Sequence, residues 1–245
     1  MKNYIFKIDK IKKTVSRKKK SVTRIFENIN IPRNQLTLVK GNTGIGKTTL
    51  INLLGLMDEV TCDKDDDILF FPNSRKEAIS YKSIPSKKIE SIRQQYFGFM
   101  FQDDHLIDSW SGWENVILPE LIRHPFMSPS LAHKTAEALI RECNFEDMLE
   151  DGMMHSSPAT FSGGQRQRLA LIRALIHSPL VLFVDEPFSS IQIDMAEEIL
   201  KVLYQKSKEG MTVIMVIHDI HDSLFENNLF DVNIIDLNGI KIIRQ

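Results

Sequence analysis

A glycine-rich loop between a predicted strand and a predicted helix constrains this chain more than any other feature. The residues GNTGIGKTT (Gly41–Thr49) fit the pattern G-x-x-x-x-G-K-[ST]. The short apolar run LTLVK precedes them, and the apolar spacing from Thr48 to Leu56 predicts a helix that starts inside the loop. Such a loop, between the carboxyl end of a strand and a helix N-terminus, is typical of α/β proteins that bind phosphate groups.

Each part of this loop has a chemical role in holding a nucleotide triphosphate. The glycines allow successive backbone N–H groups to point into one concavity. Lys47 can reach the β- and γ-phosphates, and the Thr48 hydroxyl can ligate Mg²⁺. A purely structural glycine turn is the weaker interpretation. The predicted nucleotide-binding residues of the loop are Gly41, Asn42, Thr43, Gly44, Ile45, Gly46, Lys47, Thr48 and Thr49.

A second predicted strand ends in two acids that suit the same site. The run LVLFVDE (Leu180–Glu186) is apolar, as are the central strands of parallel sheets. Asp185 at its end is placed to bind Mg²⁺ through water, and Glu186 to polarise an attacking water as general base. A strand capped by two solvated acids is the alternative, and the phosphate loop earlier in the chain favours the catalytic interpretation.

The run FSGGQRQRLALIRAL (Phe161–Leu175) resembles the signature motif of ABC (ATP-binding cassette) ATPases. Ser162, with the backbone N–H groups of Gly163 and Gly164 and with Gln165 beside them, would form a second anion-binding concavity at a helix N-terminus. The first loop already serves the chain's own nucleotide, so the second is useful only against a nucleotide on another subunit. The resemblance accordingly implies a head-to-tail dimer, a homodimer or a heterodimer with another such ATPase, with two ATP molecules at the interface.

Two further residues match the order of parts in that family. Gln102, after YFGFMF, is similar to the Q-loop glutamine, which in the family senses Mg²⁺ and the attacking water. His218, after VIMVI, is similar to the switch histidine, which contacts the γ-phosphate. Each alone would be read as an ordinary structural side chain. The resemblance implies Glu186, His218 and Gln102 as catalytic residues, Thr48, Gln102 and Asp185 as ligands of Mg²⁺, and ATP and Mg²⁺ as cofactors.

The resemblance also implies a fold and a division of the chain. The expected fold is the α/β P-loop NTPase fold of ABC ATPases, a mainly parallel central sheet with an N-terminal antiparallel β-subdomain and an inserted helical subdomain. Residues 1–245 would form one ABC ATPase domain. Its RecA-like core would take about 1–102 and 161–245, and the helix-rich segment at about 103–160 would be the helical subdomain.

The runs INLLGLMD and FQDDHLIDSWSGWENVILP are similar to one branch of the family. That branch contains the lipoprotein-release motor, the macrolide and antimicrobial-peptide exporters, and the cell-division ATPase. It implies an ATP-hydrolysing motor subunit held at the cytoplasmic face of the membrane by separate integral permease subunits. Trp110, Trp113 and Leu118 are candidate contacts for such a partner, with core packing as the alternative. A cell-division-type ATPase that transmits a signal without transport is the alternative function.

Composition limits the partners further. The chain has 31 Lys and Arg against 32 Asp and Glu, so no global charge favours nucleic acid as a partner. No apolar run approaches the roughly 20 residues needed to cross a bilayer, and the N-terminus lacks a signal-peptide core. Cys62 and Cys143 lack the spacing of a zinc site or a disulfide framework and are expected to be reduced thiols. The basic run Arg17–Lys20 is expected to be a solvated hairpin tip.

Three features depart from the family's pattern. The D-loop, usually Ser-Ala-Leu-Asp, is Ser189–Gln192 here with the sequence SSIQ, and Asp194 is the nearest acid. The aromatic residue that normally stacks on adenine is absent from Ile11–Val22, which leaves the preference between ATP and GTP open. The charged segment Cys62–Lys88 has no clear counterpart in the family's β-subdomain, and its acidic run Asp63–Asp67 is expected to be plain surface.

Overall fold

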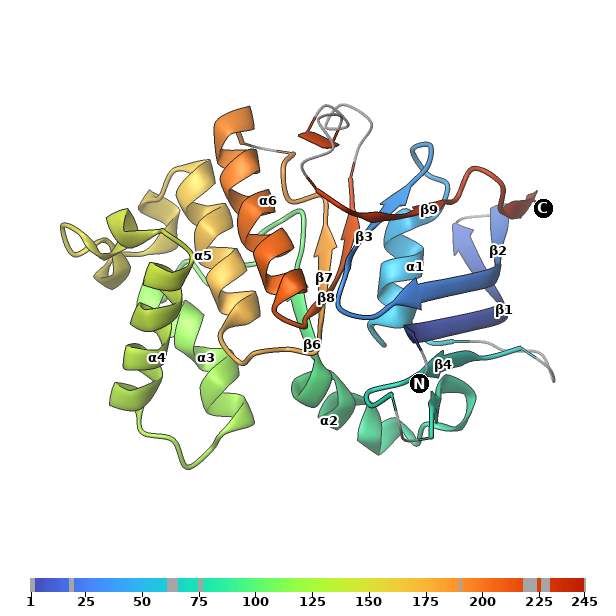
Figure 1. Cartoon of the computed structure of the whole chain (residues 1–245), viewed down its shortest axis with the longest axis horizontal. Coiled ribbons are helices and arrows are strands. Elements are labelled where there is room, and N and C mark those ends of the chain that lie inside the picture. Colours follow the sequence, from blue (N-terminus) through green and yellow to red (C-terminus); the bar gives the residue numbers. More distant parts are fainter. Residues whose placement is uncertain are drawn as a thin grey trace.

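The computed structural model of the chain describes residues 3–17, 20–60, 66–74, 77–189, 191–217, 224–225 and 230–244. Within these ranges the chain forms two five-stranded sheets, one antiparallel and one parallel, together with several helices. Figure 1 shows α1 (Lys47–Leu54) beside the N-terminal hairpin at one end of the molecule. The helices α3 (Gly112–Arg123), α4 (Pro129–Glu142) and α5 (Gly163–Leu175) lie at the other end.

The antiparallel sheet is built around a long N-terminal hairpin. Its strands, in spatial order, are β10 (Lys241–Arg244), β2 (Lys20–Pro32), β1 (Tyr4–Arg17), β4 (Ile68–Phe70) and β5 (Ile79–Ser80). The register pairs Ile11 with Phe26, so these two buried side chains share one face of the hairpin. Arg17 pairs with Lys20 at the other end, so the basic run lies at the hairpin tip as predicted; Lys18 and Lys19 lie outside the described residues.

The charged segment Cys62–Lys88 completes this sheet. Its strand β4 pairs with β1, and β5 pairs with β4, both antiparallel. The Oδ1 atom of Asp67 accepts hydrogen bonds from the backbone N–H groups of Ile68 (2.7 Å) and Lys82 (3.1 Å), which ties β4 to the 3₁₀ turn η1 (Tyr81–Ser83). The segment without a sequence counterpart is therefore part of the β-subdomain.

The expectation that Asp63–Asp67 is plain surface is wrong at Asp66, which is only 8% exposed. Pairing of β4 with the hairpin draws the residues just before Ile68 against the fold. Residues 61–65, among them Cys62, lie outside the described part of the chain.

The parallel sheet forms the centre of the molecule. Its strands, in spatial order, are β6 (Phe97–Met100), β7 (Val181–Asp185), β8 (Thr212–Val216), β3 (Leu36–Lys40) and β9 (Asn233–Asp236). Each neighbouring pair is parallel, and β7 and β8 are buried along their whole length. This explains their continuous apolar sequences, since strands covered on both faces have no solvent side. Because the strands are parallel, their carboxyl ends meet at one edge of the sheet.

The helices fall into two groups. Those that flank the sheet are α1, α2 (Ser86–Tyr96), α5 and α6 (Ile193–Lys208). Between β6 and α5 lie α3, α4 and the 3₁₀ turns η2 (Glu146–Leu149), η3 (Met153–His155) and η4 (Pro158–Thr160). They fall within the predicted helical subdomain at about 103–160, whose boundaries stay a prediction. A capping box, in which Ser111 Oγ accepts from Glu114 N–H and Glu114 Oε2 from Ser111 N–H, starts α3.

Two apolar clusters hold these layers together. One packs the hairpin and α1 against the sheet, and its rings of Phe6, Phe97 and Phe183 lie with centroids 5.3–6.2 Å apart. The other joins side chains of the inserted helices, such as Val116 and Ile140, to α5, α6 and the opposite face of the sheet. Within the described ranges, no helix has both the length and the hydrophobicity that a bilayer crossing requires.

Candidate nucleotide-binding site

The glycine-rich loop connects β3 to α1 in a conformation that only glycine adopts easily. Gly41, Gly44 and Gly46 have φ angles of 140°, 78° and 126°. At Gly46 a second constraint applies, because a Cβ atom there would lie 2.5 Å from Arg24 Cδ and 3.2 Å from Phe26 Cζ. The hairpin therefore approaches the loop so closely that any side chain at this position would displace one of them.

The loop leaves donors at the start of α1 for a ligand. Gly46 is the N-cap residue, and no side chain caps the first turn of α1. Lys47 is buried, and its Nζ donates to the carbonyl oxygen of Gly41 at 2.6 Å. Asn42, Thr43 and Thr48 are exposed to solvent. The loop thus combines uncapped helix N–H groups with a lysine, which is the donor set that an anion such as a phosphate requires.

An asparagine near the C-terminus braces the loop from the side. The backbone N–H of Asn42 donates to Oδ1 of Asn238 at 2.9 Å. Asn238 is itself held because its own N–H donates to Oδ1 of Asp236, the last residue of β9. Sequence reasoning missed this residue, which lies 196 positions away from its partner.

Three of the predicted site residues lie at the same edge of the parallel sheet as the glycine-rich loop. Asp185 ends β7, is 7% exposed and pairs in register with Val216 of β8. Glu186 follows it with a φ of 51°, held by a hydrogen bond from its N–H to the carbonyl oxygen of Val216 (3.1 Å). A positive φ is uncommon for glutamate and tends to occur at functional sites. Gln102 is exposed two residues beyond β6.

His218 lies outside the described residues; the strand before it, β8, ends at Val216. Ligands of open α/β sheets bind at the carboxyl ends of the strands, where the glycine-rich loop, Asp185, Glu186 and Gln102 gather. The oxygen donors among them are the Thr48 hydroxyl, the Gln102 amide and the Asp185 carboxylate. Hard oxygen ligands of this type fit Mg²⁺, which commonly takes the remaining positions of its shell from water and substrate phosphates.

The Ser-Gly-Gly-Gln turn starts α5 as predicted. Ser162 is the N-cap residue: its Oγ accepts from Gln165 N–H (3.3 Å), and Gln165 Oε1 accepts from Ser162 N–H (2.8 Å). Ser162 and Gly163 are exposed. A Cβ atom on Gly164 would lie 2.6 Å from Cε of Met195, so this glycine lets α6 approach. The turn is a capped, solvent-facing helix start, separate from α1 (Figure 1).

A family model described as "ABC transporter" matches residues 27–189, which include the glycine-rich loop, the acidic strand end and the Ser-Gly-Gly-Gln turn. The chain belongs to the ABC transporter family. It is therefore an ABC ATPase, and the predicted family and enzyme class are confirmed.

Individual relatives point to one branch of the family. The chain is 31% identical to the macrolide export ATP-binding/permease protein MacB of Bartonella henselae, over 78% of this chain and 27% of that protein. It is 31% identical to the lipoprotein-releasing system ATP-binding protein LolD of Rickettsia prowazekii, over 81% of this chain and 82% of LolD. The chain thus spans less than a third of MacB and most of LolD.

Solved structures agree on the fold. A dimeric structure of a post-hydrolysis state of the ATP-binding cassette MJ0796, bound to ADP and Pi, is similar with a TM-score of 0.76 and 25% identity. The similarity covers 98% of this chain and 97% of that one. The predicted fold, with a mainly parallel sheet and an antiparallel β-subdomain, is confirmed.

An arginine network, which the sequence motifs do not reveal, ties the signature helix of this ABC ATPase to the Q-loop segment. Arg166 donates from Nε and Nη2 to the two carboxylate oxygens of Asp104 (2.7 and 2.9 Å). Its Nη1 donates to Oδ1 of Asp108 (2.9 Å) and to the carbonyl oxygen of Pro158 (2.8 Å). Arg173, about two turns further along the same face of α5, donates to the carbonyl oxygens of Asp104 and His105. The segment just after Gln102 is therefore fastened to α5.

Partial burial acts to raise the pKa of Asp104, but the hydrogen bonds from Arg166 and from the Leu106 N–H outweigh it and lower that pKa below its usual value. The Asp104 carboxylate thus stays ionised at neutral pH, as the ion pair requires.

The altered D-loop leads directly into α6. Ser189 is exposed, Gln192 is the N-cap residue of α6, and Asp194 lies in the first turn of that helix. An acid there stabilises the helix through its dipole. Ser190 lies outside the described residues.

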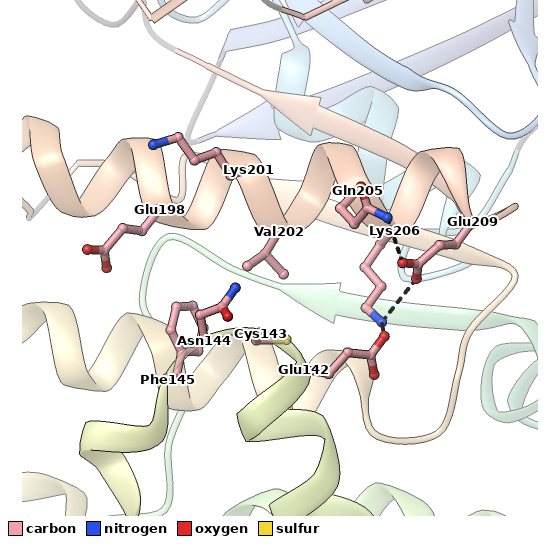
Figure 2. A pocket seen from close by; sticks show the side chains of 10 residues that line it. All are labelled: Glu142, Cys143, Asn144, Phe145, Glu198, Lys201, Val202, Gln205, Lys206 and Glu209. Carbon is pink, nitrogen blue, oxygen red and sulfur yellow. Dashed lines mark hydrogen bonds and ion pairs between the residues drawn. The ribbon is translucent and has the colours of Figure 1, made fainter.

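A cavity of about 390 Å³ lies between the end of α4 and one side of α6 (Figure 2). At its rim Lys206 forms ion pairs with Glu142 and, at 3.2 Å, with Glu209. Cys143 is a free, buried thiol, and burial raises its pKa to about 12. This thiol therefore stays protonated, in keeping with the prediction of a reduced cysteine.

Proposed function

We propose that this chain is the ATP-hydrolysing motor subunit of an ABC transporter complex of the export or lipoprotein-release type. ATP would bind at the glycine-rich loop Gly41–Thr49, the P-loop, and close two cassettes into a dimer. The closure would act on separate membrane subunits. The observation that carries the proposal is the common sheet edge that the P-loop, Asp185, Glu186 and Gln102 share. That edge offers both an anion site and a carboxylate positioned for general-base chemistry.

We assign a role in this cycle to each of the predicted site residues. Lys47 would exchange its bond to Gly41 for one to the β- and γ-phosphates, while the N–H groups of the loop hold the phosphate oxygens. Glu186 would accept a proton from the attacking water, which Gln102 helps to orient. His218 would contact the γ-phosphate. Bound Mg²⁺, held by Thr48 and Asp185 with Gln102 near it, would offset the negative charge of the phosphates.

The signature turn would complete the site of a second copy. Ser162 and Gly163 are exposed in the described structure and Gly164 is half-buried, so a nucleotide on another subunit could reach the turn. The dimeric form of the similar cassette MJ0796 supports this arrangement. Either two copies of this chain or one copy with another ABC ATPase would form such a dimer.

A groove beside the Q-loop would receive the membrane partner. It has a volume of about 490 Å³, lies where β6, α3 and α5 meet, and its lining includes Phe99, Phe101 and Ile122. Phe99 and Phe101 stack with ring centroids 5.7 Å apart, and Ile122 is 47% exposed. A partly exposed apolar groove suits an amphipathic helix from a partner. The segment that Arg166 and Arg173 hold forms one rim through His105.

The tryptophans predicted as docking contacts lie elsewhere. Among the described residues, the lining of this groove includes neither Trp110 nor Trp113. Trp113 packs against the core of the inserted helices, and its ring lies 5.0 Å from that of His133. Trp110 is 36% exposed, and Leu118 is half-buried. The groove is therefore the better candidate for docking, and MacB and LolD, whose names describe an export permease and a lipoprotein-releasing system, favour a transport partner.

The proposal is tested by ATP turnover of the purified protein, compared with the variant Glu186→Gln. The native protein is expected to hydrolyse ATP, and the variant to lose turnover by a factor of about 100 or more, because it retains binding but lacks the general base. The variant should then accumulate as an ATP-bound dimer, which light scattering coupled to gel filtration detects. A native protein that neither dimerises with ATP nor hydrolyses it, even with its membrane partner supplied, would show that the subunit is degenerate.

A further inference from the structure

The P-loop is held from its outer side by an arginine that belongs to none of the family motifs. Arg24 lies on β2, and its guanidinium donates two hydrogen bonds to the loop. Its Nε donates to the carbonyl oxygen of Ile45 (2.8 Å), and its Nη2 to the carbonyl oxygen of Gly44 (2.8 Å). Its aliphatic part packs on Gly46, since a Cβ atom there would meet Arg24 Cδ at 2.5 Å.

The effect of these hydrogen bonds follows from the fact that they engage carbonyl oxygens of the loop. In an anion-binding loop the N–H groups face the ligand and the carbonyl oxygens face away. The two carbonyls that Arg24 binds share their peptide units with the N–H groups of Ile45 and Gly46. The Ile45 N–H donates within the loop to the carbonyl oxygen of Asn42 (3.1 Å), so Arg24 and Asn42 hold that unit at both ends, and the Gly46 N–H lies at the start of α1. A hydrogen bond at the oxygen fixes the plane of the unit and polarises the N–H at its other end. The positive charge of the guanidinium also attracts an anion in the concavity.

We propose that Arg24 is a positioning residue for the nucleotide, which holds the peptide units of the P-loop in the orientation that binds phosphate groups. The inference rests on the proposed function, because it takes the triphosphate to bind at this loop. Lys47 has to leave the Gly41 carbonyl to reach a phosphate. The bonds of Arg24 go to carbonyl oxygens, which do not face a bound anion, so these bonds persist when the ligand arrives.

The chemistry of the side chain makes the proposal specific to arginine. A guanidinium presents several N–H donors in a fixed plane and can serve two neighbouring carbonyls at once, whereas an ammonium is a single point of charge on a flexible stem. Lysine at this position would keep the charge but satisfy fewer of the loop's carbonyls. The expected order of nucleotide affinity is therefore arginine, then lysine, then an uncharged side chain of similar length.

The matched control is the cross-strand neighbour of Arg24. Lys13 pairs with Arg24 in the hairpin register and also fastens the hairpin to the region beyond α1. Its Nζ lies 3.4 Å from Oδ1 of Asp58 and donates to the carbonyl oxygen of Glu59 (3.2 Å). Lys13→Met removes a hairpin attachment of similar size without touching the P-loop.

The experiment measures calorimetric affinities of the full chain for ATP and for inorganic triphosphate, together with KM, kcat and Tm. Arg24→Met should lower the affinity for both ligands about tenfold, as expected for the loss of hydrogen bonds from a charged donor. The affinities of Arg24→Lys should lie between those of Arg24→Met and of the native protein. KM should rise more than kcat falls. Lys13→Met should bind both ligands as the native protein does, with a Tm close to that of Arg24→Met.

Several results would overturn the inference. Native affinity in Arg24→Met would show that the loop does not depend on this residue. An equal loss of affinity in Lys13→Met would mean that binding depends on attachment of the hairpin in general and not on Arg24. A loss of affinity for ATP but not for triphosphate would mean that Arg24 acts on the base or the ribose instead. A native protein that binds neither ligand would defeat the proposed function itself, and the inference with it.

Discussion

The P-loop and the signature turn of this ABC ATPase differ in the contacts that hold them. The P-loop is engaged by its own chain on several sides: Lys47 donates to Gly41, Arg24 to Gly44 and Ile45, and Asn238 accepts from Asn42. The signature turn is held by its capping box, and Ser162 and Gly163 face solvent.

This difference fits the proposed function, in which the P-loop is a site that a single chain assembles and the signature turn is half of a site. A loop braced from behind is preorganised, so little conformational entropy is lost when a ligand binds. An exposed helix start gains a second wall only from another molecule.

The largest effect is expected from Lys47→Met. The variant loses the charge that reaches the phosphates, and ATP affinity should fall by about 100-fold, with turnover lost in parallel. Fluorescent-nucleotide titration measures the affinity. Lys201→Met, which removes an exposed lysine of α6, is the control and should bind as the native protein does. Unchanged affinity in Lys47→Met would mean that the P-loop is not the primary nucleotide site.

A slightly smaller effect, confined to assembly, is expected from Ser162→Arg. ATP affinity of the monomer should stay within about twofold of native, whereas turnover should fall by roughly 100-fold because the second wall of the site is blocked. The double variant with Ser162→Arg and Glu186→Gln should form no ATP-bound dimer in gel filtration with light scattering. If Ser162→Arg weakened monomer binding as much as Lys47→Met does, the contrast between the two loops would be wrong.

The smallest effect is expected from Asp104→Asn, which weakens the tie between α5 and the Q-loop segment. Nucleotide affinity should not change, and turnover should drop by a few-fold, because the signature turn is held less firmly relative to the segment after Gln102. Asp108→Asn is the control, because Asp108 makes one bond to Arg166 and is more exposed than Asp104.

The pH dependence of stability gives a second readout for Asp104. Its pKa in the folded protein is lowered, so the ion pair contributes stability above the ordinary aspartate pKa of about 3.9, and this contribution is lost as the pH falls through the lowered value. Native protein should therefore have a higher Tm than Asp104→Asn at neutral pH. The gap should close below about pH 4, and a gap that is constant down to pH 2 would contradict the ion pair.

Motifs in the sequence located much of the candidate site because their chemistry is local. The P-loop, the Asp185–Glu186 strand end and the Ser162 turn each need only a few consecutive residues at a strand or helix terminus. The predicted strands and helices around them were found for the same reason, since apolar periodicity is a property of short windows. The roles of these residues in binding and catalysis stay predictions.

What the motifs did not reveal depends on distant pairings. The segment Cys62–Lys88 shows no strand pattern of its own, yet it forms two short strands because the hairpin offers β1 as a partner edge. Asp66 is buried for the same reason, against the expectation from its charged neighbours. Strands of two or three residues carry too little periodicity to be seen before their partners are known.

The sequence by itself determined the family, the fold class and the position of each glycine-containing turn of the candidate site, because consecutive residues encode these features. Only the tertiary structure decided which side chains stand behind the turns. Arg24 reaches the P-loop through the register of the β1–β2 hairpin, and Arg166 reaches Asp104 across 62 positions of chain. Such contacts depend on strand order and on helix packing, which bring together residues that no local pattern connects.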